Sequence, residues 1–254
     1  MLADRDTRQR VERFYEQNPR MVSSPFGGID SIDRELFASV FAELEIDLTG
    51  LRVLDIGCGR GLVGELVREA GGRYLGADLV PSGEGFPLTR ADAARLPFAD
   101  ESFDAVFCID AFEHIPQPLD AAREFRRVLR SEGFMFLSAP NYRNVAGLVK
   151  RAYEGLGLYE RDTWAPFGRW AAQELEHPLT FRRVRRIYRA AGFTRQRVIG
   201  LGREVGLGLF PWIDHPRMPD VIRFRLQRLF RVIGPPIAQV FPTASLHGFW
   251  CFRA

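Results

Sequence analysis

The chain has 254 residues, of which 46% are hydrophobic and 26% are charged, and its formal net charge is +3. This composition excludes a collagen-like, repetitive or disordered chain, and a core of this size needs no disulfide or structural metal. The length exceeds that of one typical nucleotide-binding domain but falls short of two full domains.

The N-terminus and the cysteines indicate the compartment. The first ten residues, MLADRDTRQR, are charged where a signal peptide would be apolar, and no apolar stretch is long enough to span a membrane. Cys58, Cys108 and Cys251 lack CxxC spacing and predict reduced thiols. We therefore expect a cytoplasmic protein.

Positive charge gathers in the last third of the chain. Residues 179–254 hold 14 arginines, no lysine and three acidic residues, whereas the first 178 residues hold 21 basic and 29 acidic side chains. A high-GC bacterial genome accounts for the use of arginine over lysine, since Lys150 is the only lysine. It does not account for where the arginines lie.

Strands and helices are predicted to alternate over the first 140 residues. Helices are expected at 4–17 and 32–46, before the strand LRVLDIG (51–57), a glycine loop and a helix at 62–70. Further strands are expected at 74–78, 86–90, 103–110 and 134–140, with a helix containing Leu119 to Leu129 before the last. This order predicts an open, mostly parallel sheet that binds ligands at the carboxyl ends of its strands.

Beyond Pro140 the alternation stops. Residues 141–178 are irregular and rich in aromatic side chains. Thr180 is then expected to cap a helix. The last predicted elements are a strand at 193–200, a glycine-rich stretch, a helix at 219–233 and a closing strand at 245–252.

The motif VLDIGCGRG follows the first strand. Gly57, Gly59 and Gly61 permit positive φ angles and a close approach of the backbone to a ligand. Leu62 stands where a dinucleotide fingerprint has its third glycine. Asp55, directly before the loop, would repel a pyrophosphate but suits a cationic ligand, such as the amino group of S-adenosylmethionine (SAM).

Two further acids follow the next predicted strands. Asp78 ends the second strand, where a carboxylate can accept hydrogen bonds from both ribose hydroxyls, as the acid of nucleotide-binding folds does. Asp92 follows the third strand in ADAARLPF, where it could accept the amino group of an adenine.

Five segments, in this order, resemble class I SAM-dependent methyltransferases, especially the subgroup with the ubiquinone- and menaquinone-pathway enzymes. They are VLDIGCGRG, YLGADL, ADAARLPF, SFDAVFCIDAFEHI and RRVLRSEGFMFLSAPN. The resemblance covers about residues 50–140. It implies an α/β, Rossmann-like fold with a mostly parallel seven-stranded sheet and helical cap insertions. It implies cofactor contacts from Asp55, Gly57, Cys58, Gly59, Gly61, Asp78, Leu79, Asp92, Ala93 and Asp110. A Rossmann-type fold that binds NAD is the alternative.

The sequence departs from the family pattern between the second and third strands. Only LVPSGEG separates Asp78 from the strand near Phe86, whereas a parallel crossover normally needs a dozen or more residues. We therefore expect the crossover helix to be absent or reduced to a turn, and the adenine edge to be more open.

The catalytic candidates lie just past the fourth strand. SAM carries an activated methyl group, so an enzyme needs alignment and, for a hydroxyl acceptor, a general base. Asp110, Glu113 and His114 are the candidates, with His177 as an independent base. The alternative is that Glu113 and His114 only cap the next helix.

A metal site is a third interpretation of the same residues. In the ubiquinone-pathway O-methyltransferases, which this stretch resembles, a Glu-x-x-Glu-His cluster is associated with a divalent metal. Here the pattern is Asp110-x-x-Glu113-His114, and His177 could supply a fourth ligand. A divalent metal is considered but not expected.

The predicted helix at 219–233 is amphipathic. Helical spacing gathers Ile222, Leu226, Leu229, Phe230 and Ile233 on one side and Arg223, Arg225, Arg228 and Arg231 on the other. This pattern is typical of a helix that binds an anionic lipid surface or an acidic acceptor. A lid helix with solvated arginines, or a nucleic-acid contact, are the alternatives.

The sequence thus predicts a single methyltransferase domain over 1–254. Its parts would be a helical cover (1–50), a SAM-binding core (51–140) and two acceptor cap insertions (141–178 and 202–243). The reaction would be methyl transfer from SAM to an oxygen, or less favourably a carbon, of a small or lipid-linked acceptor. The aromatic cap favours a hydrophobic acceptor, and the arginines favour an acidic one. A non-catalytic SAM-binding module and a nucleic-acid methyltransferase are the alternatives. The expected location is cytoplasmic, with peripheral contact at the inner membrane face left open.

Overall fold

The computed structural model describes residues 2–18, 33–156, 174–194, 196–215 and 217–254. Most of the turn-rich linker after the first predicted helix lies outside the described residues. So do four of the aromatic residues expected in the first cap insertion: Tyr159, Trp164, Phe167 and Trp170.

A seven-stranded sheet forms the centre of the protein, with strand order β3-β2-β1-β4-β5-β7-β6. Only β7 runs antiparallel, between β5 and β6. The mostly parallel seven-stranded sheet predicted from the sequence is therefore confirmed. Its strands are β1 (Arg52–Ile56), β2 (Arg73–Asp78), β3 (Leu88–Arg90), β4 (Phe103–Ile109), β5 (Leu129–Pro140), β6 (Gln196–Gly200) and β7 (His247–Arg253).

Strand side chains alternate between two hydrophobic cores because successive residues of a strand point to opposite faces. On β4, Val106 and Cys108 join one core, whereas Phe107 joins the other. Both faces are apolar and buried, which is why the sequence of β4 reads as a continuous hydrophobic run.

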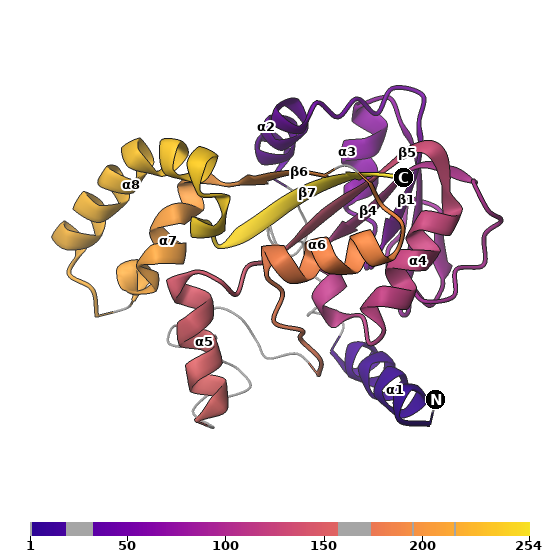
Figure 1. Ribbon diagram of the computed structural model, residues 1–254, viewed down its shortest axis with the longest axis horizontal. Coiled ribbons are helices and arrows are strands. Elements are labelled where there is room, and N and C mark those ends of the chain that lie inside the picture. Colours follow the sequence, from indigo (N-terminus) through magenta and orange to yellow (C-terminus); the bar gives the residue numbers. More distant parts are fainter. Residues whose placement is uncertain (1, 19–32, 157–173, 195, 216) are drawn as a thin grey trace.

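Helices cover both faces of the sheet (Figure 1). One core holds side chains of α2 (Arg34–Leu44) and α3 (Val63–Glu69), and the other holds side chains of α4 (Pro118–Val128) and α6 (Phe181–Ala190). The predicted cap of α6 is confirmed, since Thr180 Oγ1 accepts from the Arg183 amide at 3.2 Å. The N-terminal helix α1 (Leu2–Gln17) lies below the sheet in Figure 1.

The crossover between β2 and β3 contains no helix, as the short LVPSGEG segment predicts. Residues 79–87 are all described and form only bends and extended backbone. The segment instead folds onto the glycine loop: Ser82 donates from its amide to the Gly59 carbonyl at 3.2 Å. Gly83 packs so closely that a Cβ atom there would lie 1.9 Å from the Arg60 carbonyl oxygen.

Three helices form an extension that we call the helical arm: α5 (Val145–Gly155), α7 (Val205–Leu209) and α8 (Asp220–Val240). Figure 1 shows the arm at one end of the molecule, beyond the ends of β5 and β7. The sequence did not predict α5 or α7, and it ended α8 at residue 233. The helix continues through Pro235 and Pro236 to Val240. The division into cover, core and cap insertions stays a prediction.

Candidate active site

The glycine loop after β1 lies directly against the segment that follows β4. Gly57 has φ of 71°, and a Cβ atom there would lie 2.3 Å from the Ala111 Cβ, so a larger residue could not fit. Ala111 stands between Asp110 and the Phe112–His114 turn. The loop predicted to approach the cofactor and the acids predicted to act on the acceptor therefore meet at the carboxyl edge of the sheet.

Asp78, at the end of β2, is fixed by the backbone of the neighbouring loops. Its Oδ2 accepts from the Gly59 amide at 2.8 Å and its Oδ1 from the Val80 amide at 2.9 Å. Each carboxylate oxygen has a second lone pair, so Asp78 keeps the capacity to accept hydroxyl donors. Its neighbour Leu79 accepts from Arg90 through its carbonyl at 2.7 Å.

Asp55 is buried and forms a hydrogen bond with the neighbouring strand β2. The residue is 1% exposed and accepts from the Tyr74 hydroxyl at 2.8 Å. Burial raises the pKa of Asp55 to about 7, although the Tyr74 hydrogen bond opposes that rise. Cys58, also predicted at the cofactor, is buried nearby, and burial raises the pKa of its thiol above the usual range.

Helix α1 crosses the outer side of this edge. Arg8 pairs with Asp92 at 3.1 Å, and Arg90 pairs with Glu16 at 2.8 Å. Asp92 also accepts from the Ala94 amide at 3.0 Å, and Ala93 between them is half-buried against the core. The edge left open by the missing crossover helix is thus bordered by α1.

Tyr15 brings α1 into the same electrostatic field as the predicted site residues. Burial raises the pKa of the Tyr15 hydroxyl above its usual range, and the negative charges of Glu113, Asp78 and Glu176 raise it further. These three acids come from three separate segments of the chain.

Asp110 follows β4 in a backbone conformation that few non-glycine residues adopt, with φ of 45°. Its Oδ1 accepts from the Ser138 hydroxyl at 2.6 Å. Its Oδ2 lies 3.6 Å from His247 Nε2 and has no hydrogen-bond partner within the described part of the chain. Burial raises the pKa of Asp110, and the charge of His247 partly offsets this.

Glu113 is a second buried acid with one carboxyl oxygen that lacks a hydrogen-bond partner among the described residues. The residue is 2% exposed, and its Oε2 accepts no hydrogen bond from any described residue. Burial and then the negative charge of Asp110 raise the pKa of Glu113 well above its usual range. A buried acid that lacks a partner is costly unless it is protonated or meets a ligand.

His114 is oriented by a backbone carbonyl. Its Nδ1 lies 2.6 Å from the Leu175 carbonyl oxygen, and its Nε2 lies 3.8 Å from Glu113 Oε1. Burial lowers the pKa of His114, so the imidazole is neutral near pH 7. A neutral ring must donate from Nδ1 to the carbonyl, which leaves the Nε2 lone pair as the basic position.

His177 is directed away from the other candidates. Its Nε2 lies 3.0 Å from the Ile115 carbonyl oxygen, and its amide donates to the Glu113 carbonyl at 2.7 Å. Burial lowers its pKa as well. These contacts connect residues 174–178 to the turn that carries Glu113.

The predicted metal ligands point in different directions. Asp110 faces Ser138 and His247, whereas His114 faces the Leu175 carbonyl. Among the residues that the structure describes, no group of three or more His, Cys, Asp or Glu side chains is arranged to hold a metal ion. The donor set thus does not fit a metal in this arrangement.

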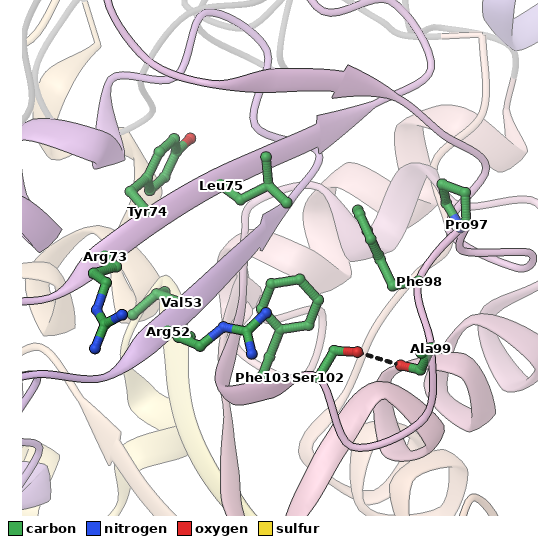
Figure 2. Close-up of a pocket in the computed structure, with 10 residues that line it drawn as sticks. All are labelled: Arg52, Val53, Arg73, Tyr74, Leu75, Pro97, Phe98, Ala99, Ser102 and Phe103. Atoms are coloured by element: carbon green, nitrogen blue, oxygen red, sulfur yellow. Dashed lines mark hydrogen bonds between the residues drawn. The ribbon is translucent and has the colours of Figure 1, made fainter.

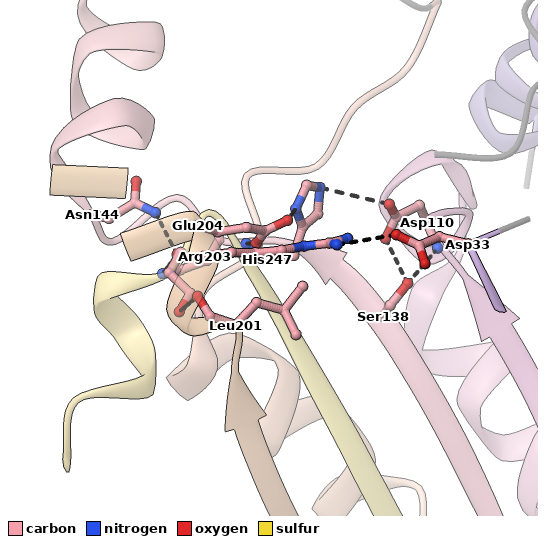
Figure 3. Close-up of polar contacts among 10 residues, drawn as sticks. Asp33, Asp110, Ser138, Asn144, Leu201, Arg203, Glu204 and His247 are labelled. Atoms are coloured by element: carbon pink, nitrogen blue, oxygen red, sulfur yellow. Dashed lines mark hydrogen bonds and ion pairs between the residues drawn. The ribbon is translucent and has the colours of Figure 1, made fainter. Parts of the chain in front are cut away.

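Two polar groups at this edge were not predicted from the sequence. In the first, His247 Nδ1 lies 3.0 Å from Glu204 Oε1, and the His247 amide donates to Glu204 Oε2 at 2.9 Å (Figure 3). Burial alone would lower the pKa of His247, but Glu204 and Asp110 raise it to about 9. No sequence spacing links His247 to Glu204, which lies 43 residues earlier.

In the second group, Lys150 Nζ lies 2.6 Å from both Glu176 Oε1 and the Tyr142 hydroxyl. The Tyr142 hydroxyl also donates to Glu176. Burial alone would raise the pKa of Glu176, but Lys150 lowers it overall. The only lysine in the chain is therefore half of a buried ion pair, and its rarity was the one signal in the sequence.

A separate hollow of about 370 Å³ lies at the opposite edge of the sheet (Figure 2). It is lined by the first residues of three strands, Arg52, Arg73 and Phe103. Arg52 stacks over the Phe103 ring at 5.5 Å. Ligands of parallel sheets bind at the carboxyl ends of the strands, so this hollow is not the candidate site.

The chain is similar to known methyltransferases. Residues 54–137 match a family model described as a methyltransferase domain. The ubiquinone biosynthesis O-methyltransferase of Xanthomonas oryzae pv. oryzae (strain PXO99A) is 32% identical over 114 residues, which is 40% of this chain and 48% of that protein. The enzyme of the same name from Cereibacter sphaeroides (strain KD131) is 32% identical over 127 residues, 44% of this chain and 51% of that protein. The chain thus spans about half the length of these relatives.

Solved structures share the fold at lower identity. A SAM-dependent methyltransferase from Archaeoglobus fulgidus has a TM-score of 0.57 at 18% identity, covering 88% of this chain and 95% of its own. Phosphoethanolamine N-methyltransferase 2 of Haemonchus contortus, solved with SAM, has a TM-score of 0.58 at 17% identity, covering 95% and 56%. At such identities the likeness establishes the fold alone.

Proposed function

From the premise that this chain contains a methyltransferase domain with the class I SAM-dependent fold, we propose that it transfers a methyl group from SAM to an oxygen atom of an acceptor. The observation that carries the proposal is the contact between Gly57 and Ala111. It brings the glycine loop, which would hold the cofactor, against the turn that presents Glu113 and His114.

The residues at this edge fit the proposed cofactor. Asp78 retains lone pairs for ribose hydroxyls, and the Gly57 backbone leaves room where a side chain would clash. Asp78 and the acids after β4 would offer carboxyl groups to a ligand that carries a sulfonium and an ammonium charge. Asp92 and Ala93 would meet the adenine, beside the Arg8 pair.

When bound, SAM supplies a methyl group already activated by its sulfonium centre. The protein must then align the acceptor oxygen and remove its proton. We propose His114 as the general base, because its Nδ1 is fixed on the Leu175 carbonyl and its Nε2 is the basic position. The acceptor proton would pass to His114 Nε2 while the new carbon–oxygen bond forms and the carbon–sulfur bond breaks. S-adenosylhomocysteine would be released.

Asp110, Glu113 and His177 take supporting roles in this proposal. Asp110 and Glu113 would place two carboxyl groups beside the reacting groups, and Glu113 Oε1 lies 3.8 Å from His114 Nε2. His177 would hold the segment 174–178 against the Glu113 turn. A carbon acceptor remains the less favoured variant, because the relatives reported above are named O-methyltransferases.

We propose a hydrophobic and lipid-linked acceptor, which residues 219–233 would help to reach at a membrane surface. The exposed apolar side chains and arginines of α8 support such a peripheral contact. Within the described residues, no helix has the length and hydropathy of a membrane span.

Calorimetry tests the cofactor assignment. Titration with SAM should give a dissociation constant in the micromolar range, and titration with NAD should give no heat of binding. Asp78→Ala should weaken SAM binding by at least tenfold. Gly57→Ala should abolish it, because the new Cβ would displace Ala111. Gly50→Ala is the matched control, since Gly50 also has a positive φ of 75° but nothing within 4 Å of its added Cβ.

Mass spectrometry tests the reaction. A panel of hydroxylated aromatic, lipid-linked and carboxylated acceptors should include one that gains 14 mass units in the presence of SAM, about the mass of the added CH₂. A non-catalytic SAM-binding module would bind SAM and methylate none of them. Methylation of RNA or DNA instead, with binding that weakens steeply as salt is raised, would favour the nucleic-acid alternative.

A further inference from the structure

The solvent side of α8 carries large apolar side chains in a row. Val221, Phe224 and Val232 are 63%, 67% and 70% exposed. Their separations of three and eight residues, with Arg228 between them, place them along one stripe of the helix. Soluble proteins usually bury side chains of this size, so the stripe requires an explanation.

Arginines share this side of the helix. Arg225, Arg228 and Arg231 are all exposed. Within the described residues, no carboxylate lies at ion-pair distance from any of the three, whereas Asp220 is already paired with Arg223 at 2.8 Å. The stripe is therefore apolar and positively charged at once.

The core of the arm does not use this stripe. The inner side of α8 packs Phe230, Ile237 and Ala238 against Val205 and Ala244. Gly206 allows the Phe230 ring to approach, since a Cβ there would lie 2.9 Å from it. The exposed side chains could thus be replaced without removing the contacts that hold α8 in place.

Exposed apolar groups continue into segments next to the helix. Trp212 and Phe210, in the turn that contacts α8, are 37% and 36% exposed, and their rings lie 5.9 Å apart. Phe241, directly after α8, is 63% exposed. Figure 1 shows α8 at the end of the molecule, where a flat surface could reach it without meeting the sheet.

We propose that the solvent side of α8 docks on an anionic lipid bilayer. Phe224 and Val232 would enter the headgroup region, and the three arginines would contact lipid phosphates. A second copy of the chain would bring like charges together on this stripe. A nucleic acid would pair with the arginines but would leave the apolar side chains in water. The membrane contact deepens the proposed function, because it would place the arm at the source of a lipid-linked acceptor.

Vesicle co-sedimentation of the full chain tests the proposal. Extruded vesicles of phosphatidylglycerol and phosphatidylcholine should retain the protein, and vesicles of phosphatidylcholine alone should retain at least tenfold less. Raising the salt concentration should weaken the binding without abolishing it, because screening removes the charge contribution only.

Two sets of substitutions separate the contribution of the arginine charges from that of the apolar side chains. The triple variant Arg225→Gln, Arg228→Gln and Arg231→Gln should bind the anionic vesicles about 100-fold more weakly, since each arginine near such a surface changes partitioning roughly fivefold. Phe224→Asp with Val232→Asp should lose at least tenfold on the same vesicles, and Phe224→Leu with Val232→Ile should retain the binding.

A matched control uses α6, whose arginines are equally exposed. The triple variant Arg182→Gln, Arg185→Gln and Arg186→Gln removes the same charge and should bind vesicles within threefold of the unaltered chain. Equal losses in both triple variants would overturn the proposal, because binding would then depend on total charge and not on α8.

Two further outcomes would also overturn it. The first is an absence of binding to the anionic vesicles. The second is a dimer, detected by sedimentation velocity, that Phe224→Asp with Val232→Asp dissolves. SAM calorimetry on the same samples separates this proposal from the proposed function. Retained SAM affinity without vesicle binding refutes the membrane contact alone, and vesicle binding without SAM affinity refutes the cofactor assignment alone.

Discussion

Two carboxylates flank the His247 imidazole at its two nitrogens, Glu204 at Nδ1 and Asp110 near Nε2. A buried cation between two acids is stabilised by both, and each acid would be left uncompensated if the charge were removed. Since Glu204 belongs to the segment leading into α7 and Asp110 to the end of β4, this histidine connects the arm to the candidate site.

The charge of His247 can be measured directly. Its pKa of about 9 lies above the usual value near 6.5, so protonation stabilises the fold fully below pH 6.5, and this contribution is lost as pH rises through 9. An NMR titration should show His247 losing its proton at a higher pH than His114 and His177, with Glu204→Gln lowering the pKa of His247 by a unit or more. Titration of His247 near 6.5 in the unaltered chain would contradict the ion-pair interpretation.

The pKa of His114 is shifted in the opposite direction from that of His247. Because burial lowers its pKa below 6.5, the base is active at neutral pH, and turnover should fall only as pH drops below that value. His114→Gln should reduce kcat by roughly 100- to 10,000-fold on the acceptor found by mass spectrometry, with SAM affinity unchanged within threefold. His215→Gln, on the arm, is the control and should keep full activity. An unchanged kcat in His114→Gln would remove His114 as the base.

At the scale of elements, α1 compensates for the helix that is missing between β2 and β3. It contacts the predicted cofactor edge through ion pairs of Arg8 with Asp92 and of Arg90 with Glu12 and Glu16. Both arginines are about half exposed, so each pair contributes little, on the order of 0.2–1 kcal/mol. Helix α1 is thus held at this edge of the sheet by several weak ion pairs together with the side chain of Tyr15.

Replacing both arginines should weaken the contact of α1 with this edge of the sheet. Arg8→Gln with Arg90→Gln should raise the dissociation constant of SAM by up to about tenfold, mainly through faster dissociation in stopped-flow measurements. Arg34→Gln is the control, because Arg34 pairs with Glu65 and Glu69 away from this edge. If the double variant binds SAM as the control does, α1 is not part of the cofactor site.

The sequence predicted those elements whose pattern is local. Strong apolar periodicity identified all seven strands and α6, and the length of LVPSGEG was enough to predict the absent crossover helix. The arm was harder, because α7 is only five residues long and contains two glycines. Pro235 and Pro236 are signals that normally end a helix, yet α8 continues through them.

The residues of the candidate site also fall into two groups, those that a local sequence pattern predicted and those that it did not. The Gly57 loop, Asp78 and the β4 acids follow strand ends, so their proximity follows from the parallel order of the sheet. Glu204 and Glu176 reach the same edge from distant segments with no repeating spacing. Only the tertiary packing of β7 and α5 brings them to His247 and Lys150, and a single sequence carries no record of such contacts.

Across the whole molecule, hydrophobic burial is unequal. The two cores on the faces of the sheet are large, whereas the separate core of the arm consists of three buried residues, Val205, Ala238 and Ala244. Polar contacts next to the arm add to the packing of this small core. One of them is the ion pair between Arg203 and Asp33, at 3.0 Å (Figure 3). Regions with few buried apolar contacts open at lower free energy than the rest of a protein.

Hydrogen exchange should reveal this difference. Amides of α8 should exchange through local opening, at free energies well below that of global unfolding, whereas amides of β4 and β5 should exchange only through global unfolding. Anionic vesicles should slow exchange in α8 and leave β4 unchanged if the membrane proposal holds. Equal protection of α8 and β4 in the free protein would show that the arm and the sheet unfold as one unit.

The buried Lys150 has a practical consequence for chemical labelling. The chain has a single ε-amino group, and it is 5% exposed and held by Glu176 and Tyr142. Acylating reagents should therefore modify this side chain only when α5 separates from the segment around Glu176. The acylation rate of Lys150, followed by mass analysis of the peptide that contains it, would then report how often α5 separates from this segment, without any engineered probe.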